Sequence, residues 1–204
     1  MGRSALRVEE SLVNVQAIDA VRRRCDEMAA VLAALDHEAI AGAIEALVRV
    51  RSDGGTIFTC GNGGSAGTAS HLALDLQKAA RGTQNTTRAL CLSDNVGLLT
   101  AWANDADFET VFAQQLAVLA RPGDALLVIS VSGSSPNLVR ALEEARRLEL
   151  VTVGLLGKDG GAARRLCDHS VIVRDHDYGW VESAHVVLHH LVTYGLRDAA
   201  LAEE

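Results

Sequence analysis

Five apolar runs, each followed by sequence of helical character, constrain the fold more than any other feature of this chain. The expected strands are Thr56 to Cys60, Arg88 to Leu92, Ala125 to Ser130, Val151 to Leu156 and Val171 to Arg174. The runs do not alternate apolar and polar residues, so both faces of the sheet should be covered by helices. The pattern favours an α/β fold with a doubly wound, mostly parallel five-stranded sheet flanked by helices. Ligands of such sheets bind at the carboxyl ends of the strands.

Two amphipathic helices are expected ahead of the first strand. Apolar side chains recur every three or four residues from about Val8 to Ala34, and again from about Glu38 to Val50. We expect a single domain over residues 1–204, with N-terminal helices in residues 1–52 and an α/β core in residues 53–204. The apolar stripe of the first helix must be covered, and oligomer formation is the simplest way to cover it. The alternative is that this helix packs on the chain's own sheet.

Composition argues against several classes of partner. The net charge is -7 and the basic residues are not clustered, so direct binding of nucleic acid is not expected. No apolar stretch approaches the roughly 18 residues that cross a bilayer, and no membrane partner is expected. The four cysteines form no CxxC pair and the N-terminus lacks the apolar segment of a signal peptide, so a reduced, cytoplasmic location is expected.

A glycine-rich turn, CGNGGS at Cys60 to Ser65, lies between the first strand and the next helix. Glycines let backbone N–H groups approach a ligand, and a helix N-terminus carries partial positive charge, so this turn could hold an anion without a basic side chain. It matches neither GxGxxG nor a Walker loop, which disfavours dinucleotides and nucleoside triphosphates. Taken alone, the motif is equally compatible with a turn that binds nothing.

A second turn, SVSGSSPN at Ser130 to Asn137, also leaves a strand and enters a helix. Serine hydroxyls donate hydrogen bonds to phosphate oxygens, as do the free amides of a helix start. Capping of the helix by Ser134 or Ser135 is the alternative explanation, but it needs only one of the four serines. Two such turns at strand ends predict one pocket that holds a phosphate with neutral donors.

Ionisable side chains follow the first turn and recur near the C-terminus. His71 and Asp75 are four residues apart, so they share one face of the predicted helix. A later helix carries Glu182 and His190. Together the two helices could supply imidazoles and carboxylates to one metal ion.

Helix geometry does not choose among the histidines of that later helix. At about 100° per residue, Glu182, His185 and His189 lie closer to one face than Glu182 and His190 do. The residues by themselves therefore leave the second histidine open.

In these motifs the chain resembles the sugar isomerase (SIS) domain family, and within it the phosphoheptose isomerase group. Besides the two turns and the His71 to Asp75 spacing, the resemblance includes SDN at 93–95, AND at 103–105, GLLGKDGG at 154–161 and ESAHVVLHH at 182–190. It extends from the first helix to the last. It implies a five-stranded α/β fold, a homotetramer with sites between subunits, and isomerisation of sedoheptulose 7-phosphate to glycero-manno-heptose 7-phosphate.

The resemblance also implies roles for individual residues. Those implied to contact phosphate or sugar are Asn62, Gly63, Gly64, Ser65, Asp105, Ser130, Ser132 and Ser135. Those implied to hold one zinc or other divalent ion per site are His71, Asp75, Glu182 and His190. Asp75 and His190 are implied to transfer protons through a cis-enediol. Because the family spaces its histidines as HxxxxH, His190 is selected, and His185 and His189 are expected to pack or hydrogen-bond instead.

Two departures from the family pattern affect the sugar end of the site. Asp75 replaces the usual glutamate, and Glu182 replaces a glutamine. Two carboxylates with two neutral histidines would fully neutralise a divalent ion and weaken its pull on substrate oxygens.

Two other functions are possible for this fold. A catalytically silent binding module of the replication-initiator-associating type lacks the terminal histidine, so the presence of His190 with Asp75 favours an enzyme. Sugar-phosphate-responsive transcription regulators carry a helix-turn-helix domain, for which the roughly 50 residues before the first strand are too few and too acidic.

Overall fold

The structure is a computed structural model that describes residues 2–79 and 86–203. The chain divides into two compact units, Met1–Ala34 and Leu35–Glu204. The first unit is a single helix, α1 (Gly2–Ala33), which confirms the predicted first helix and begins earlier than expected. Its apolar side chains at Val15, Ile18 and Val21 are exposed in this chain.

The second unit is built on a five-stranded sheet with the order β2-β1-β3-β4-β5. The strands are β1 (Thr56–Gly61), β2 (Arg88–Cys91), β3 (Ala125–Ser130), β4 (Val151–Gly157) and β5 (His169–Val173). Every neighbouring pair is parallel, which confirms the predicted fold class. The carboxyl ends of β1 and β3 therefore lie next to each other, at the edge where both turns begin.

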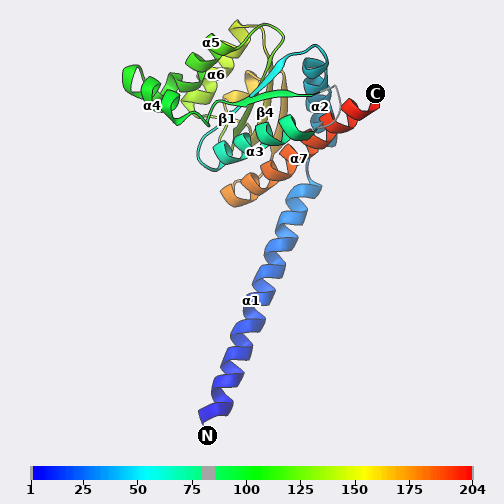
Figure 1. The fold of residues 1–204 in the computed structure, drawn as a ribbon. Coiled ribbons are helices and arrows are strands. Elements are labelled where there is room, and N and C mark those ends of the chain that lie inside the picture. The colour runs from blue at the N-terminus through cyan, green and yellow to red at the C-terminus, as the bar shows by residue number, and fades with distance from the viewer. Residues whose placement is uncertain (1, 80–85, 204) are drawn as a thin grey trace. The chain divides into compact units, whose positions relative to one another are not determined.

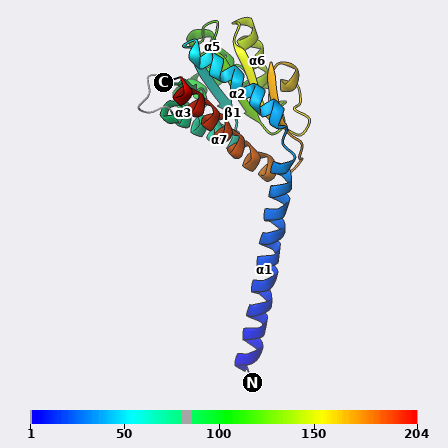
Figure 2. The ribbon, with the colours of Figure 1, turned by 90° about the vertical axis from the view of Figure 1, so that its right-hand side faces the viewer.

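Helices cover both faces of this sheet. They are α2 (His37–Ser52), α3 (Gly64–Ala79), α4 (Val96–Asp105), α5 (Val111–Leu119), α6 (Pro136–Arg147) and α7 (Tyr178–Ala202), with short 3-10 turns η1 (Phe108–Thr110) and η2 (Ala163–Arg165). Figure 1 shows α5 and α6 on one side of the sheet and α3 and α7 on the other. Figure 2 shows α2 in the same layer as α7, which it contacts.

Burial on both faces explains why the sequence of the central strands does not alternate in polarity. All six residues of β3 are buried. Leu126 and Val128 belong to the apolar cluster that includes α5 and α6 residues, whereas Leu127 and Ile129, which are also fully buried, alternate with them along the strand. Both faces of the strand are thus covered, as the apolar runs predict.

Local signals in the sequence set where the helices begin. The Asp36 side chain caps α2 by accepting a hydrogen bond of 3.0 Å from the N–H of Ala39. The Asp177 side chain caps α7 by accepting bonds of 2.8 and 3.1 Å from the N–H groups of Gly179 and Trp180. Pro136 occupies the first turn of α6, where its missing N–H costs nothing.

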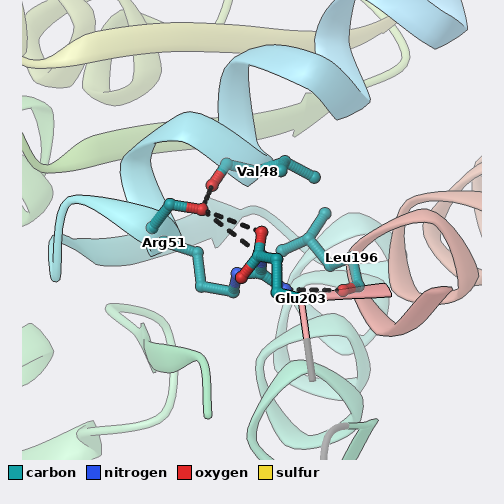
Figure 3. Close-up of polar contacts among 5 residues, drawn as sticks. Val48, Arg51, Leu196 and Glu203 are labelled. Carbon is teal, nitrogen blue, oxygen red and sulfur yellow. Dashed lines mark hydrogen bonds and ion pairs between the residues drawn. The ribbon is translucent and has the colours of Figure 1, made fainter. Parts of the chain in front are cut away.

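A buried arginine joins the end of α2 to the end of α7. The Arg51 side chain is only 2% exposed and forms an ion pair with Glu203. Its other terminal nitrogen donates to the carbonyl oxygen of Leu196 at 2.9 Å (Figure 3). The last turn of α2 is thereby fixed to the helix that carries the C-terminal histidines.

The division into units falls after Ala34, so α2 belongs with the sheet. Its buried residues include Ile40, Leu47 and Val50. Over the described residues, no helix combines the length and the apolar character needed to cross a bilayer. The cytoplasmic location remains a prediction.

Candidate functional site

The two turns predicted to form one pocket are joined by their side chains. Asn62 follows β1 and Asn137 lies in the first turn of α6. Each side-chain amide donates to the oxygen of the other, and both hydrogen bonds are 2.9 Å long. Asn137 is buried, and its amide is satisfied by this exchange. It belongs to the quoted SVSGSSPN motif, although no role was expected for it individually.

The first turn is shaped by its glycines and by a neighbouring serine. Gly63 has a positive φ of 55° and precedes Gly64, the first residue of α3. Ser65 is buried in the first turn of α3. The Ser93 hydroxyl donates to the carbonyl oxygen of Gly61 at 3.0 Å and accepts from its N–H at 3.3 Å, which gives the SDN motif a structural role in holding β1.

The second turn is held by its own hydroxyls and by the loop after β4. Ser130 Oγ accepts a hydrogen bond of 3.0 Å from the N–H of Gly133. Gly133 has a positive φ of 60°, and a Cβ there would overlap the carbonyl oxygen of Gly160. The N–H of Ala163 donates to the Gly133 carbonyl at 2.8 Å. The GKDGG segment thus packs against the serine-rich turn, and Ala163 just beyond it is hydrogen-bonded to the same turn.

Two serines of this turn differ in how their hydroxyls are used. Ser132 Oγ accepts a bond of 3.2 Å from the N–H of Ser134. Ser135 stands at the N-cap of α6, but its side chain makes no capping hydrogen bond. Helix capping therefore does not account for the Ser135 hydroxyl, which remains a candidate donor to a ligand.

Three imidazoles surround one carboxylate oxygen between α3 and α7. Asp75 Oδ2 lies 3.4 Å from Nε2 of His71, 3.5 Å from Nε2 of His189 and 3.8 Å from Nε2 of His190. The ring centroids of His189 and His190 are 3.9 Å apart, and those of His71 and His189 are 4.5 Å apart. The two helices thus bring together His71, Asp75 and His190, three of the four residues expected to hold a metal.

The histidines of this cluster differ strongly in their exposure to solvent. The His189 side chain is fully buried, whereas His71 is 48% and His190 is 38% exposed. A pocket of about 400 Å³ opens beside it, lined by His71, Asp75, Lys78, Ala79, His190, Thr193, Tyr194 and Arg197. A ligand in this pocket would contact the exposed edges of two imidazoles.

Burial keeps two histidines of α7 neutral. The pKa of His189 is lowered to about 4, chiefly by burial and then by the imidazoles of His190 and His71, against an opposing effect of Asp75. Burial also lowers the pKa of His185 to about 4, against a smaller opposing effect of the Leu156 backbone. His185 lies in the interior, as expected. His189 is buried too, but it also joins the cluster. Helix geometry alone had left open whether His189 or His190 would do so.

Two expected site residues lie outside this cluster in the single chain. A Cβ on Gly64 would come 2.5 Å from Glu182 Oε1, so the Glu182 carboxylate sits at the N-terminus of α3. Asp105 is exposed at the end of α4, where its Oδ1 accepts a bond of 2.8 Å from the Asn104 side chain. Their roles toward metal and sugar therefore remain predictions.

The residues of the cluster fit a divalent metal ion. Among the described residues, His71, Asp75, His189 and His190 each offer one ligand atom, and these atoms all lie within 4.8 Å of one another. Ligands about 2.0 to 2.2 Å from a tetrahedral zinc ion lie about 3.3 to 3.6 Å apart, so a modest contraction would complete such a site. Both ring nitrogens of buried His189 lack a hydrogen-bond partner among the described residues, a cost that coordination would relieve.

The fold and site together define a class of protein: a parallel α/β protein with a glycine-rich and a serine-rich turn at its carboxyl edge and a cluster of histidines and one carboxylate between α3 and α7. A model of the SIS domain matches residues 19–157. The chain belongs to the SIS domain family, and its curated relatives include phosphoheptose isomerases.

Two of these relatives and one solved structure indicate how close the similarity is. The phosphoheptose isomerase of Nitratiruptor sp. is 42% identical over 136 residues, which cover 67% of this chain and 73% of that protein. The phosphoheptose isomerase of Trichlorobacter lovleyi is 39% identical over 153 residues, which cover 75% and 78%. The structure of a phosphoheptose isomerase from Francisella tularensis aligns with a TM-score of 0.82 at 28% identity, covering 91% of this chain and 98% of that one.

Proposed function

We propose that this chain is an aldose–ketose isomerase that converts sedoheptulose 7-phosphate to glycero-manno-heptose 7-phosphate. The observation that carries the proposal is the convergence of His71 and His190 on Asp75, in a chain whose relatives are phosphoheptose isomerases. The helix that begins at the glycine turn, α3, carries His71 and Asp75. One element therefore connects an anion site with a cluster suited to proton transfer.

The two joined turns hold the phosphate in this proposal. Neutral donors surround the site: backbone N–H groups at the starts of α3 and α6, and the hydroxyls of Ser132 and Ser135. The amide exchange between Asn62 and Asn137 fixes the spacing of the two turns. Such prearranged dipoles bind a dianion without a paired lysine or arginine.

The sugar end lies toward the cluster. His71 is seven residues beyond Gly64, which is about 10 Å along a helix axis. In an extended seven-carbon sugar, the phosphate and the first two carbons are separated by a comparable distance. Glu182 belongs to α7, and its carboxylate lies against the start of α3. It would lie alongside the bound sugar.

Asp75 and His190 transfer the protons of the reaction. One removes a proton from the first carbon of the ketose, which gives a cis-enediol, and the other returns a proton to the second carbon. The aldose forms as the hydroxyl proton moves between the two oxygens. A divalent metal ion, zinc among others, would polarise these oxygens when held by residues of the cluster. Asp105 would contact sugar hydroxyls from a neighbouring subunit, because it lies outside the cluster in a single chain.

The test is conversion of sedoheptulose 7-phosphate, followed by NMR in D₂O through the appearance of the aldose and the incorporation of deuterium. Asp75→Asn and His190→Asn are expected to lower the rate by at least about a hundredfold each. His37→Asn, an exposed histidine at the start of α2, is the matched control and should retain the rate. No conversion by the wild-type chain, with or without added divalent metal, would contradict the proposal and favour a binding module.

We further propose that the chain works as a homotetramer in which α1 takes part in subunit contacts. Val15, Ile18 and Val21 are 54%, 44% and 62% exposed in the single chain and fall on one helix at spacings of three residues. Val15→Glu with Val21→Glu should dissociate the assembly in sedimentation velocity runs. A wild-type chain that sediments as a monomer at micromolar concentration would rule this out.

A further inference from the structure

We infer that His189, and not Glu182, supplies the fourth protein ligand of the metal site, which then consists of three imidazoles and the Asp75 carboxylate. This inference rests on the proposed function, because it specifies the metal site of that same enzyme. It concerns His189, which the resemblance assigns to packing or hydrogen bonding and not to metal binding.

The placement of His189 points to coordination. Its side chain is fully buried, and neither ring nitrogen has a hydrogen-bond partner among the described residues. A buried polar nitrogen left without a partner costs about 1 to 3 kcal/mol. A structural histidine at this depth would normally donate to a carbonyl or carboxylate oxygen at about 2.7 to 3.2 Å. The carboxylate oxygen Oδ2 of Asp75 lies 3.5 Å from Nε2 of His189.

The surroundings of Asp75 argue against a simple ion pair. One oxygen, Oδ2, faces Nε2 atoms of three histidines at 3.4, 3.5 and 3.8 Å. A carboxylate that accepts hydrogen bonds approaches its donors more closely and uses both oxygens. Four ligand atoms within 4.8 Å of one another instead resemble the corners of a coordination shell, whose edges measure about 3.3 to 3.6 Å for zinc.

Glu182 is engaged elsewhere. Its carboxylate lies against Gly64 at the start of α3, seven residues before His71. On α7 it lies eight residues before His190, or about 12 Å along the helix axis. The α3 N-terminus itself stabilises a negative charge at that position. Glu182 therefore faces the region between the turns and the cluster, where its carboxylate would contact substrate.

The exchange of ligands changes the charge of the site. Three neutral imidazoles and one carboxylate leave a divalent ion with a net charge of one, whereas a second carboxylate would cancel it. The remaining charge would stabilise negative charge that develops on the substrate oxygens. The replacement of a neutral family residue by Glu182 would then leave the net charge at the metal unchanged, because Glu182 is not a ligand.

Metal affinity of the full chain, measured after chelator treatment, tests the inference. Zn²⁺ binding is followed by competition with a chromophoric chelator, and Co²⁺ binding by visible absorption. His189→Gln is expected to weaken Zn²⁺ affinity by about a hundredfold or more, and to lower the intensity of the Co²⁺ bands. Glu182→Gln is expected to stay within about threefold of wild type.

His185→Gln is the matched control. His185 lies one turn before His189 on the same helix and is equally buried, but it lies outside the cluster. It should bind Zn²⁺ as wild type does, so a loss confined to His189→Gln is not a general effect of altering a buried histidine. A hundredfold loss in Glu182→Gln together with normal affinity in His189→Gln would overturn the inference.

A measurement on the unaltered chain covers the case in which His189→Gln does not fold. X-ray absorption of the zinc-loaded protein should give three imidazole ligands, and two or fewer would contradict the inference. Isomerase turnover is measured in parallel. Turnover with only two imidazoles overturns the ligand assignment alone, whereas three imidazoles without turnover overturns the proposed function alone.

Discussion

The Glu182 carboxylate occupies the space into which any residue other than glycine at position 64 would project its Cβ, at 2.5 Å from Oε1. The first residue of α3 is therefore matched to a side chain from α7, more than a hundred positions later in the sequence. Because α3 carries His71 and Asp75 as well, this contact joins the start of that helix to α7.

Gly64→Ala should displace the Glu182 carboxylate and lower isomerase activity by at least about tenfold, since a misplacement of about 1 Å in an active site can cost a hundredfold. The free energy of unfolding should change by less than about 1 kcal/mol. The Glu182 carboxylate loses its contact with the start of α3, but alanine has a better helix propensity than glycine, which offsets the loss. Gly67→Ala is the matched control: nothing lies within 4 Å of a Cβ there, so activity should be retained and stability should rise by about 0.5 to 1 kcal/mol. Full activity in Gly64→Ala would show that the position of Glu182 does not matter.

The amide exchange between Asn62 and Asn137 should be visible as a coupling energy. Urea unfolding of Asn62→Ala, Asn137→Ala and the double variant is expected to give about 1 to 2 kcal/mol of coupling, because each single change leaves the other amide without partners. Exposed Asn104→Ala, which loses one bond to Asp105, should cost less than about 0.5 kcal/mol. Additive single changes would mean that the two turns are held by their backbones alone.

Buried His185 should make the chain sensitive to acid. Its pKa of about 4 in the folded state lies below the usual 6.5, so the unfolded state binds the proton first as the pH falls. The destabilisation of the folded state by His185 is absent above about pH 6.5 and reaches roughly 3 kcal/mol near pH 4. Chelator-treated wild type and His185→Leu are compared by urea unfolding between pH 7 and pH 4. Their stabilities should diverge over this window, with the wild type losing more, and parallel curves would refute the assignment.

The buried Arg51 should contribute strongly to the attachment of α2 to α7. Arg51→Met removes the ion pair with Glu203 and the bond to the Leu196 carbonyl, and is expected to cost about 2 to 4 kcal/mol. Glu203→Gln should cost less, about 1 kcal/mol, because Glu203 is 41% exposed and water reaches the pair. Arg49→Met, an exposed position on the same helix, is the control and should lie within about 0.5 kcal/mol of wild type. Equal effects at Arg51 and Arg49 would contradict the role given to burial.

Much of the fold follows from local sequence. Unbroken apolar runs predict strands covered on both faces, and the strand at Ala125 to Ser130 has the expected bounds. The last strand, His169–Val173, begins before its apolar run, because the backbone of His169 and Ser170 pairs with β4 whatever their side chains are. Boundaries of this kind depend on the neighbouring strand and not on the residues themselves.

Part of the site is equally local. The two turns follow strands and open helices, and His71 and Asp75 share a face of one helix, so their neighbourhood follows from spacing alone. Asn137 could have been suspected from its place in the serine-rich motif, but its partner could not, because the two amides are 75 residues apart.

Local patterns were enough to predict the buried strands, the glycine-rich and serine-rich turns and the pairing of His71 with Asp75, because each reflects residues close together in one strand, turn or helix. Which side chains of α7 reach that pair depends instead on how the helices pack together. His189 and His190 differ by about 100° around their helix, and the choice is set by how α7 is rotated against its neighbours. Gly195 packs so closely on Ile44 of α2 that a Cβ would come 2.5 Å from it, and long-range contacts of this kind fix the rotation.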